Sequence, residues 1–261
     1  MITRDNLLDV IEQNKEILDV VSSRVDDTKE QSLLFRYKPL DSIKYYLMQK
    51  TSVILFPTPD THYGGLLTYR NQRFYLHINT AQPKTYENFV WVHEYYHYRY
   101  EKERIQDKQT ETFFEDSVLN AQERHANLFA SELLVDTRVL KESFAQISKS
   151  YPDRPIEEKV IHLIAIFEVP YKVLVIKLLQ DGLISPSAAL DLIDYDYLDH
   201  LPDDFDTSIF HPSLVIKLNN LKTLLSSPRM QERLTGNEYE RFTDQYKTVL
   251  ARLKEKRASN V

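Results

Sequence analysis

Residues 91–98 read Trp-Val-His-Glu-Tyr-Tyr-His-Tyr, with two histidines four positions apart and a glutamate directly after the first. Side chains four apart lie on the same face of an α-helix. His93 and His97 are therefore expected to bind one metal ion, and Glu94, one step round the helix, to hold a water molecule as general base. The alternative is an aromatic helix in which two hydrogen-bonded histidines are ordinary packing residues.

The composition restricts which ligands can complete such a site. The chain has no cysteine, so a zinc site must use histidine and carboxylate side chains. A third histidine on the same helix is excluded, because Tyr100 and Glu103 occupy the positions where such sites carry glycine and histidine. The third ligand is therefore expected from another helix.

The next amphipathic stretch, residues 120–135, offers that ligand. Glu123 lies at the edge of its apolar stripe and can face the motif helix, with Asn127 one turn further on to orient a ligand. His125, two residues from Glu123, is expected to point to the surface. Taken alone, Glu123 is more typical of a solvated acid on a helix, so this assignment depends on the motif helix.

The length, composition and net charge restrict which class of protein this chain can be. The 261 residues are 42% hydrophobic, enough for one large domain or a domain with an appendage. The net charge of −6 does not favour wholesale binding to nucleic acid or anionic membranes. No apolar run reaches the roughly 18 residues of a membrane span, and the first residues lack a signal core. We therefore expect a soluble, cytoplasmic protein.

The hydrophobic periodicity predicts an α+β fold with a small antiparallel sheet. The elements expected are helices at 4–22, 38–49, 86–104 and 117–149, two short helices within 156–183, strands at 52–56, 66–69 and 73–78, and a polar loop at 105–116. An acidic, aromatic-rich segment covers 191–206, and a helical tail covers 213–256. The predicted domains are 1–187, with the motif helix, and a helical C-terminal extension, 188–261, of unknown role.

The two motifs together resemble the ImmA/IrrE family of zinc metallopeptidases. That family combines an H-E-x-x-H helix with a helix of the form E-x-x-A-N-x-F-A-x-x-L-L, and this chain has His-Glu-Tyr-Tyr-His at 93–97 and Glu-Arg-His-Ala-Asn-Leu-Phe-Ala from 123. The resemblance covers roughly residues 40–185. One departure is Val135-Asp136 after the leucines, where the family often has Met-Pro. A second is that the short N-terminal region leaves no room for the family's frequent repressor-like domain.

The resemblance implies a zincin-like fold in which an active-site helix pair packs on the sheet. It implies Zn²⁺ held by His93, His97 and Glu123, and Glu94 as the catalytic base. It also implies a protein substrate, a helix-turn-helix repressor encoded nearby, which site-specific cleavage would remove. Residues 186–261 match no family motif.

Two other functions are compatible with the same residues. In the first, the metal site is structural or degenerate and the chain acts as an anti-repressor that only binds its target. In the second, residues 156–184 form a DNA-binding helix-turn-helix, but its second helix is mostly apolar and offers few phosphate contacts, so direct nucleic-acid binding is not expected. The donor that stabilises the transition state is left open between His62, His77 and several tyrosines. The separate His162, His200 and His211 are expected to be structural or exposed.

Overall fold

The computed structural model describes residues 2–60, 62–108, 112–115, 120–203 and 205–258. The strands are β1 (Ser52–Phe56), β2 (Tyr63–Arg70), β3 (Arg73–Asn79), β4 (Thr112–Glu115) and β5 (Lys217–Leu218). The helices before the last long connection are α1 (Leu7–Glu30), α2 (Leu33–Tyr37), α3 (Pro39–Lys50), α4 (Lys84–Tyr100), α5 (Lys102–Lys108), α6 (Ala121–Leu134), α7 (Thr137–Ser150), α8 (Ile156–Phe167), α9 (Tyr171–Gln180) and α10 (Pro186–Leu192). They are followed by the 3₁₀ turns η1 (Tyr197–His200) and η2 (Thr207–Phe210) and by α11 (Leu221–Leu225), α12 (Pro228–Arg233) and α13 (Gly236–Ala258).

The strands form one mixed sheet in the order β4-β2-β3-β1-β5. β2 pairs antiparallel with β3 and β4, and β5 pairs antiparallel with β1, but β1 and β3 are parallel, with Val53 opposite Leu76. The α+β class is confirmed, but the small sheet is mixed and not purely antiparallel, because β3 inserts between β1 and β2 and pairs parallel with β1. Asn71 and Gln72, both at positive φ, close the β2–β3 hairpin as the two central residues of a tight turn.

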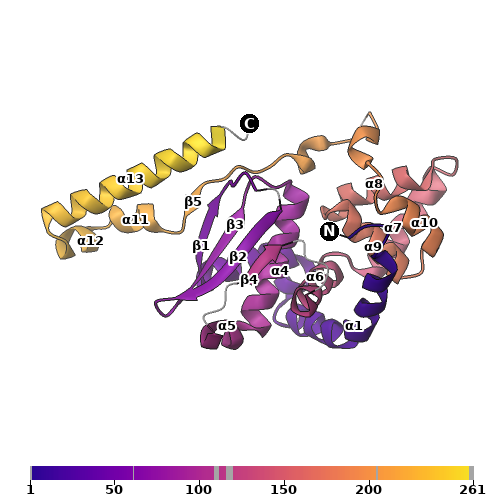
Figure 1. Cartoon of the computed structure of the whole chain (residues 1–261), viewed down its shortest axis with the longest axis horizontal. Coiled ribbons are helices and arrows are strands. Elements are labelled where there is room, and N and C mark those ends of the chain that lie inside the picture. The colour runs from indigo at the N-terminus through magenta and orange to yellow at the C-terminus, as the bar shows by residue number, and fades with distance from the viewer. Residues whose placement is uncertain (1, 61, 109–111, 116–119, 204, 259–261) are drawn as a thin grey trace.

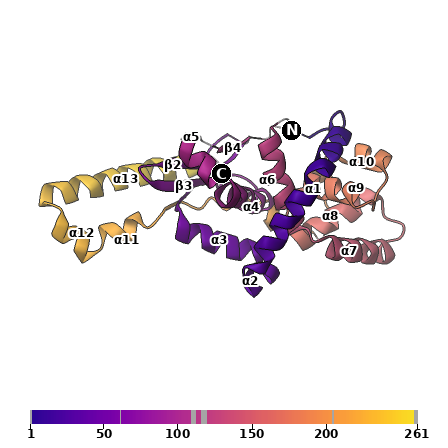
Figure 2. The ribbon, with the colours of Figure 1, turned by 90° about the horizontal axis from the view of Figure 1, so that it is seen from below.

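Helix α4 crosses one face of the sheet, α3 and α6 pack beside it, and α1 packs along α6 (Figure 1). The first core lies between these elements and includes the fully buried Trp91, Tyr95, Tyr96 and Phe129. A second core joins α7–α10 to the start of α1 through Leu7 and Ile11. Figure 2 shows α7–α10 at one end of an elongated molecule and α11–α13 at the other, with the sheet between them.

Two predicted long helices are each divided. The helix expected at 86–104 ends at Tyr100, and a separate helix, α5, starts at Lys102 and continues to Lys108, into the segment expected to be loop. The helix expected at 117–149 breaks after Leu134, because the Asp136 carboxylate accepts hydrogen bonds from the backbone N–H groups of Arg138 and Val139 and so caps α7. Its expected beginning, 117–119, lies outside the described residues. α1 runs eight residues past the predicted end, to Glu30.

The C-terminal segment contributes to the sheet as well as to helices. Leu214 N–H donates to the carbonyl of Thr80, the Thr80 hydroxyl donates to the carbonyl of Val215, and β5 follows on the outer side of β1. The tail expected to be helical therefore begins with a strand. No described helix is both long enough and apolar enough to cross a membrane. The domain boundary at 187/188 stays a prediction.

Candidate metal centre

The motif lies in the most enclosed part of α4. Pro83 precedes the helix, and its middle, from Asn88 to His97, is largely buried because the sheet, α3 and α6 surround it. His93 and His97 are 1% and 0% exposed, and Glu94 is 0% exposed. Polar groups buried to this extent require partners. The sequence therefore places three ionisable side chains where only specific contacts can stabilise them.

The structure brings His93, His97 and Glu123 together at the junction of α4 and α6. The Nε2 atom of His93 lies 3.0 Å from Oε2 of Glu123, and the Nε2 atom of His97 lies 3.6 Å from Oε1 of the same carboxylate. The two Nε2 atoms are 3.0 Å apart. In the part of the chain that is described, this is the cluster able to hold a metal ion, with all three ligand atoms within 4.8 Å of one another.

The other nitrogen of each imidazole fixes its orientation. His93 Nδ1 lies 3.0 Å from Oδ1 of Asn127, and His97 Nδ1 lies 2.9 Å from Oε2 of Glu101. Both oxygens are acceptors, so each Nδ1 carries the proton and donates it. Each Nε2 faces the centre of the cluster and offers a lone pair there once its ring is neutral, which is the arrangement of a metal-ligating imidazole.

Glu101 is the residue that sequence reasoning missed. It is one helical turn after His97 and directly follows the last residue of α4, and its carboxylate also accepts a hydrogen bond from Arg104. The four-residue spacing from His97 was a usable signal, because such pairs meet on a helix surface. Asn127, in contrast, was expected near a ligand and lies there.

Glu94 faces strand β2. A Cβ atom at Gly65 would lie 3.1 Å from Oε1 of Glu94, so this glycine lets the strand approach the carboxylate closely. Both Glu94 oxygens are buried without a hydrogen-bond partner among the described atoms. Burial raises the pKa of Glu94 to about 8, with the charge of His97 opposing this and that of Glu123 adding to it. A carboxyl with such a pKa can exchange a proton near neutral pH.

The side chains of the cluster influence one another's pKa values. Burial lowers the pKa of His93 despite its contact with Glu123. Burial also acts to lower the pKa of His97, but the hydrogen bonds to Glu101 and Glu123 outweigh it and raise this pKa to about 10. Burial would raise the pKa of Glu123, yet the two histidines hold it below its ordinary value. The carboxyl groups of Glu94, Glu101 and Glu123 thus surround two imidazoles, and this arrangement favours a cation.

This donor set fits zinc. Two imidazole nitrogens and one carboxylate leave one position of a tetrahedron open, as catalytic zinc sites do. The charges of His97 and Glu123 act on the unpartnered Glu94 carboxyl, which is close enough to the cluster to serve it. Calcium and magnesium prefer all-oxygen ligands and fit these residues less well.

The other candidate residues lie elsewhere. His77 is on the sheet face opposite α4, because Gly65 and its neighbour Ile78 face the helix and side chains alternate along a strand. Its ring instead contacts the Tyr63 hydroxyl and the Phe56 carbonyl. His125, expected at the surface, is half-buried with its ring near Tyr96. His162 stacks on Tyr151, and neither histidine belongs to the metal cluster.

Comparison with known proteins gives one match. Residues 49–179, half of the chain, match the model of a peptidase family described as the IrrE N-terminal-like domain. This range includes the described strands β1 to β4 and every residue of the metal cluster. No curated protein and no solved structure matches the chain.

Proposed function

We propose, from the premise that this chain belongs to the peptidase family of IrrE N-terminal-like domains, that it is a zinc-dependent metalloendopeptidase. The observation that carries the proposal is the buried cluster of His93, His97 and Glu123 with the unpartnered carboxylate of Glu94 beside it. The family and the cluster together support a metallopeptidase-type function. The choice of zinc follows from the donor set.

Each side chain has a role in this proposal. His93, His97 and Glu123 would hold the ion, while Asn127 and Glu101 would fix the two imidazole rings. When bound, zinc supplies Lewis acidity toward a peptide carbonyl and toward water. Glu94 accepts a proton from the attacking water and returns it to the leaving amine. Its raised pKa suits both steps, because a proton held there is neither too tightly nor too weakly bound near neutral pH.

We further propose that the substrate is a helix-turn-helix transcriptional repressor, cut at a specific site in the cytoplasm. The support is the resemblance of the two motifs to the ImmA/IrrE family, whose members remove such repressors. Direct recognition of DNA is not part of the proposal. Helix α9, the recognition helix of the alternative reading, buries Leu174, Val175 and Leu178 in the second core.

The competing function is an anti-repressor that binds without cutting. The acidic segment at 191–206 is its candidate docking surface, although Asp191 pairs with Arg4 and Asp194 with Lys172 within the chain. These ion pairs reduce the charge available to a partner. The competing function therefore has weaker support than the peptidase.

The test compares the wild-type chain with Glu94→Gln and, as control, Glu103→Gln, an exposed glutamate on α5. Zinc content is measured by elemental analysis, and cleavage of the repressor encoded beside the gene is followed by mass spectrometry. We expect about one zinc per chain in all three proteins. Cleavage should fall on the order of 10²- to 10⁴-fold in Glu94→Gln only. Unchanged cleavage by Glu94→Gln, or no zinc uptake by the wild type, would favour the anti-repressor.

A further inference from the structure

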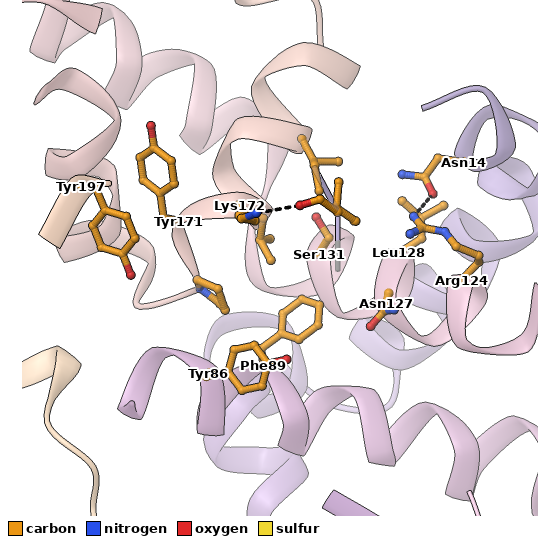
Figure 3. A pocket seen from close by; sticks show the side chains of 14 residues that line it. Asn14, Tyr86, Phe89, Arg124, Asn127, Leu128, Ser131, Tyr171, Lys172 and Tyr197 are labelled. Atoms are coloured by element: carbon orange, nitrogen blue, oxygen red, sulfur yellow. Dashed lines mark hydrogen bonds between the residues drawn. The ribbon is translucent and has the colours of Figure 1, made fainter. Parts of the chain in front are cut away.

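A cavity of about 290 Å³ lies between the start of α4, helix α6 and helix α9 (Figure 3). Its walls are mostly apolar and aromatic and include Tyr86, Phe89, Leu128, Tyr171, Ile176 and Tyr197. A volume of this size accommodates a small molecule or one large side chain rather than a peptide segment. Apolar walls with a few polar groups are typical of ligand sites.

Arg124 supplies a charged wall of this cavity. It is 5% exposed, and its guanidinium reaches from α6 toward α1, where it donates to the Oδ1 atom of Asn14 (Figure 3). Its Nε atom is buried without a partner, and no carboxylate of the described residues pairs with it. A guanidinium keeps its charge at neutral pH. A buried charge without a counter-ion is costly.

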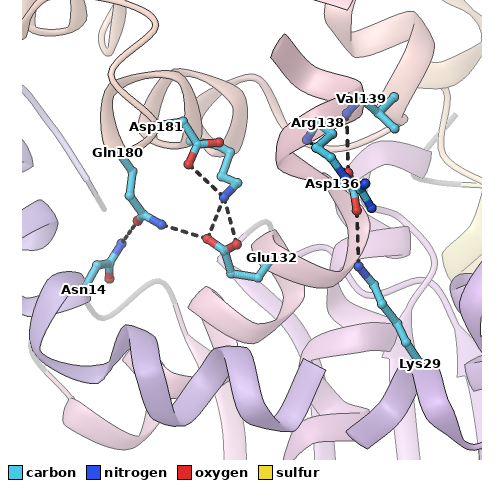
Figure 4. Close-up of polar contacts among 9 residues, drawn as sticks. Asn14, Lys29, Glu132, Asp136, Arg138, Val139, Gln180 and Asp181 are labelled. Carbon is cyan, nitrogen blue, oxygen red and sulfur yellow. Dashed lines mark hydrogen bonds and ion pairs between the residues drawn. The ribbon is translucent and has the colours of Figure 1, made fainter. Parts of the chain in front are cut away.

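The neighbouring cations differ from Arg124 in this respect. Lys177, 2% exposed, binds both Glu132 and Asp181 (Figure 4). Lys172, which also lines the cavity, pairs with Asp194. The hydrogen-bond chain from Asn14 does lead through Gln180 to Glu132, but that carboxylate is two amide groups away and already bound by Lys177. Of the two cations that line the cavity, Arg124 is the one whose carboxylate partner is missing among the described residues.

The cavity also adjoins the metal centre. Asn127 lines it, and the same side chain accepts the hydrogen bond from His93 Nδ1. Arg124 directly follows the ligand Glu123 on α6. A molecule in the cavity would therefore contact the residue that orients one metal ligand, and could shift the backbone turn that carries another.

We infer that this cavity binds a carboxylate attached to a ring-sized apolar body, with the carboxylate on Arg124 and the body against the aromatic walls. Occupation changes how firmly the metal centre holds its ion, through Asn127. The carboxylate belongs to a free small acid, which makes the cavity an effector site. Binding itself is independent of the proposed peptidase activity, whereas the effect on the ion rests on the proposed metal site.

The first experiment measures binding by calorimetry on the full chain. The probes are 3-phenylpropionate and its uncharged amide, and the variants are Arg124→Gln and the control Lys172→Gln. We expect the acid to bind about ten- to a hundredfold more tightly than the amide, because only the acid can form a charge-assisted hydrogen bond with Arg124. Arg124→Gln should abolish this preference, and Lys172→Gln should keep it. Equal binding of acid and amide, no binding of either in the millimolar range, or a preference retained in Arg124→Gln overturns the inference.

A second variant tests the cavity in case Arg124→Gln does not fold. Ile176→Trp fills the cavity from α9 and leaves Arg124 in place. A folded Ile176→Trp protein, verified by circular dichroism, should lose acid binding. Retained binding would show that the acid binds elsewhere.

The link to the metal centre is tested by chelator competition. The zinc affinity of the wild type should change several-fold when 3-phenylpropionate is saturating, and this change should vanish in Asn127→Ala although the acid still binds. An unchanged zinc affinity in the wild type, or the same change in Asn127→Ala, overturns the link while leaving acid binding intact. A non-competitive effect of the acid on repressor cleavage would support the effector site, and competitive inhibition would overturn it by showing that the acid occupies the path of the substrate.

Discussion

The Nδ1 atom of His97 lies 2.9 Å from the Oε2 atom of Glu101, which is four residues further on, directly after the last residue of α4. The carboxylate orients the ring and increases the basicity of the opposite nitrogen, which faces Glu123. We predict that Glu101→Ala weakens zinc binding about 10- to 100-fold without removing a ligand. Chelator competition measures this change. Glu103→Ala, which alters an exposed acid on α5, should bind zinc as the wild type does, and equal affinities for both variants would contradict the role of Glu101.

The close approach of Gly65 to α4 leaves no room for a larger side chain at this position. A Cβ atom at this position would lie 2.8 Å from Cγ1 of Val90 and 3.1 Å from the backbone oxygen of His77. Neither atom is the end of a flexible chain, so Gly65→Ala should cost about 1–3 kcal/mol in unfolding free energy and displace Glu94. Thermal unfolding and cleavage assays measure the two effects. Gly236→Ala, where an added Cβ meets nothing within 4 Å, is the matched control, and wild-type behaviour of both variants would refute this packing argument.

His77 makes the stability of the fold sensitive to acid. Burial lowers its pKa to about 4, against the opposing hydrogen bond to Phe56. Because the unfolded chain binds the proton at an ordinary pKa of about 6.5, unfolding is favoured as pH falls from 6.5 to 4, by roughly 3 kcal/mol at most. Above pH 6.5 both states are neutral and the contribution is fully present. Urea unfolding at several pH values should show a smaller loss in His77→Gln, and identical pH profiles of the two proteins would contradict this.

Removing the buried cation of Lys177 should cause a large loss of stability, because the cation forms several ion pairs. Its Nζ atom lies 2.8 Å from both oxygens of Glu132 and 3.2 Å from Asp181 Oδ1 (Figure 4). Lys177→Met leaves two enclosed carboxylates without their cation, so we expect a loss of about 3–5 kcal/mol in urea unfolding. Lys247→Met breaks an exposed pair with Asp244 and should change stability by less than about 1 kcal/mol. Similar losses in the two variants would show that burial does not set the cost.

The candidate metal cluster could be predicted from the sequence because the signals for it are local. The spacing of His93 and His97 depends only on helix geometry. The periodicity from residue 120 onward offered Glu123 as a third ligand, but only the presence of the motif helix favoured it over a solvated acid. The same rule pointed to Glu101, which was overlooked because an acid after the motif reads as a solvated residue. The break between α6 and α7 was also present in the sequence, as an aspartate able to cap a helix at 136.

The direction of β1 relative to its neighbouring strands could not be predicted from the sequence. Alternation of apolar residues identifies a strand and its buried face, but it carries no information about which neighbour the strand pairs with. The short connection from β1 to β2 is compatible with a hairpin, and only the packing of the whole sheet inserts β3 between them. The cavity beside Arg124 could not be predicted from the sequence either, because residues of α1, α4, α6 and α9 form it together.

The pairing of β5 with β1 bears on how this protein avoids aggregation. β1 has the sequence Ser-Val-Ile-Leu-Phe, rich in the apolar and β-branched residues that recruit strands of other molecules when a sheet edge is uncovered. Lys217 and Leu218 cover Leu55 and Ile54, and Asn219 N–H donates to the carbonyl of Val53. A proteolytic nick before residue 213 would release this cover even if the metal centre stayed whole. Loss of solubility would then precede loss of catalysis, and the lifetime of the protein in a protease-rich cell would depend on a two-residue strand.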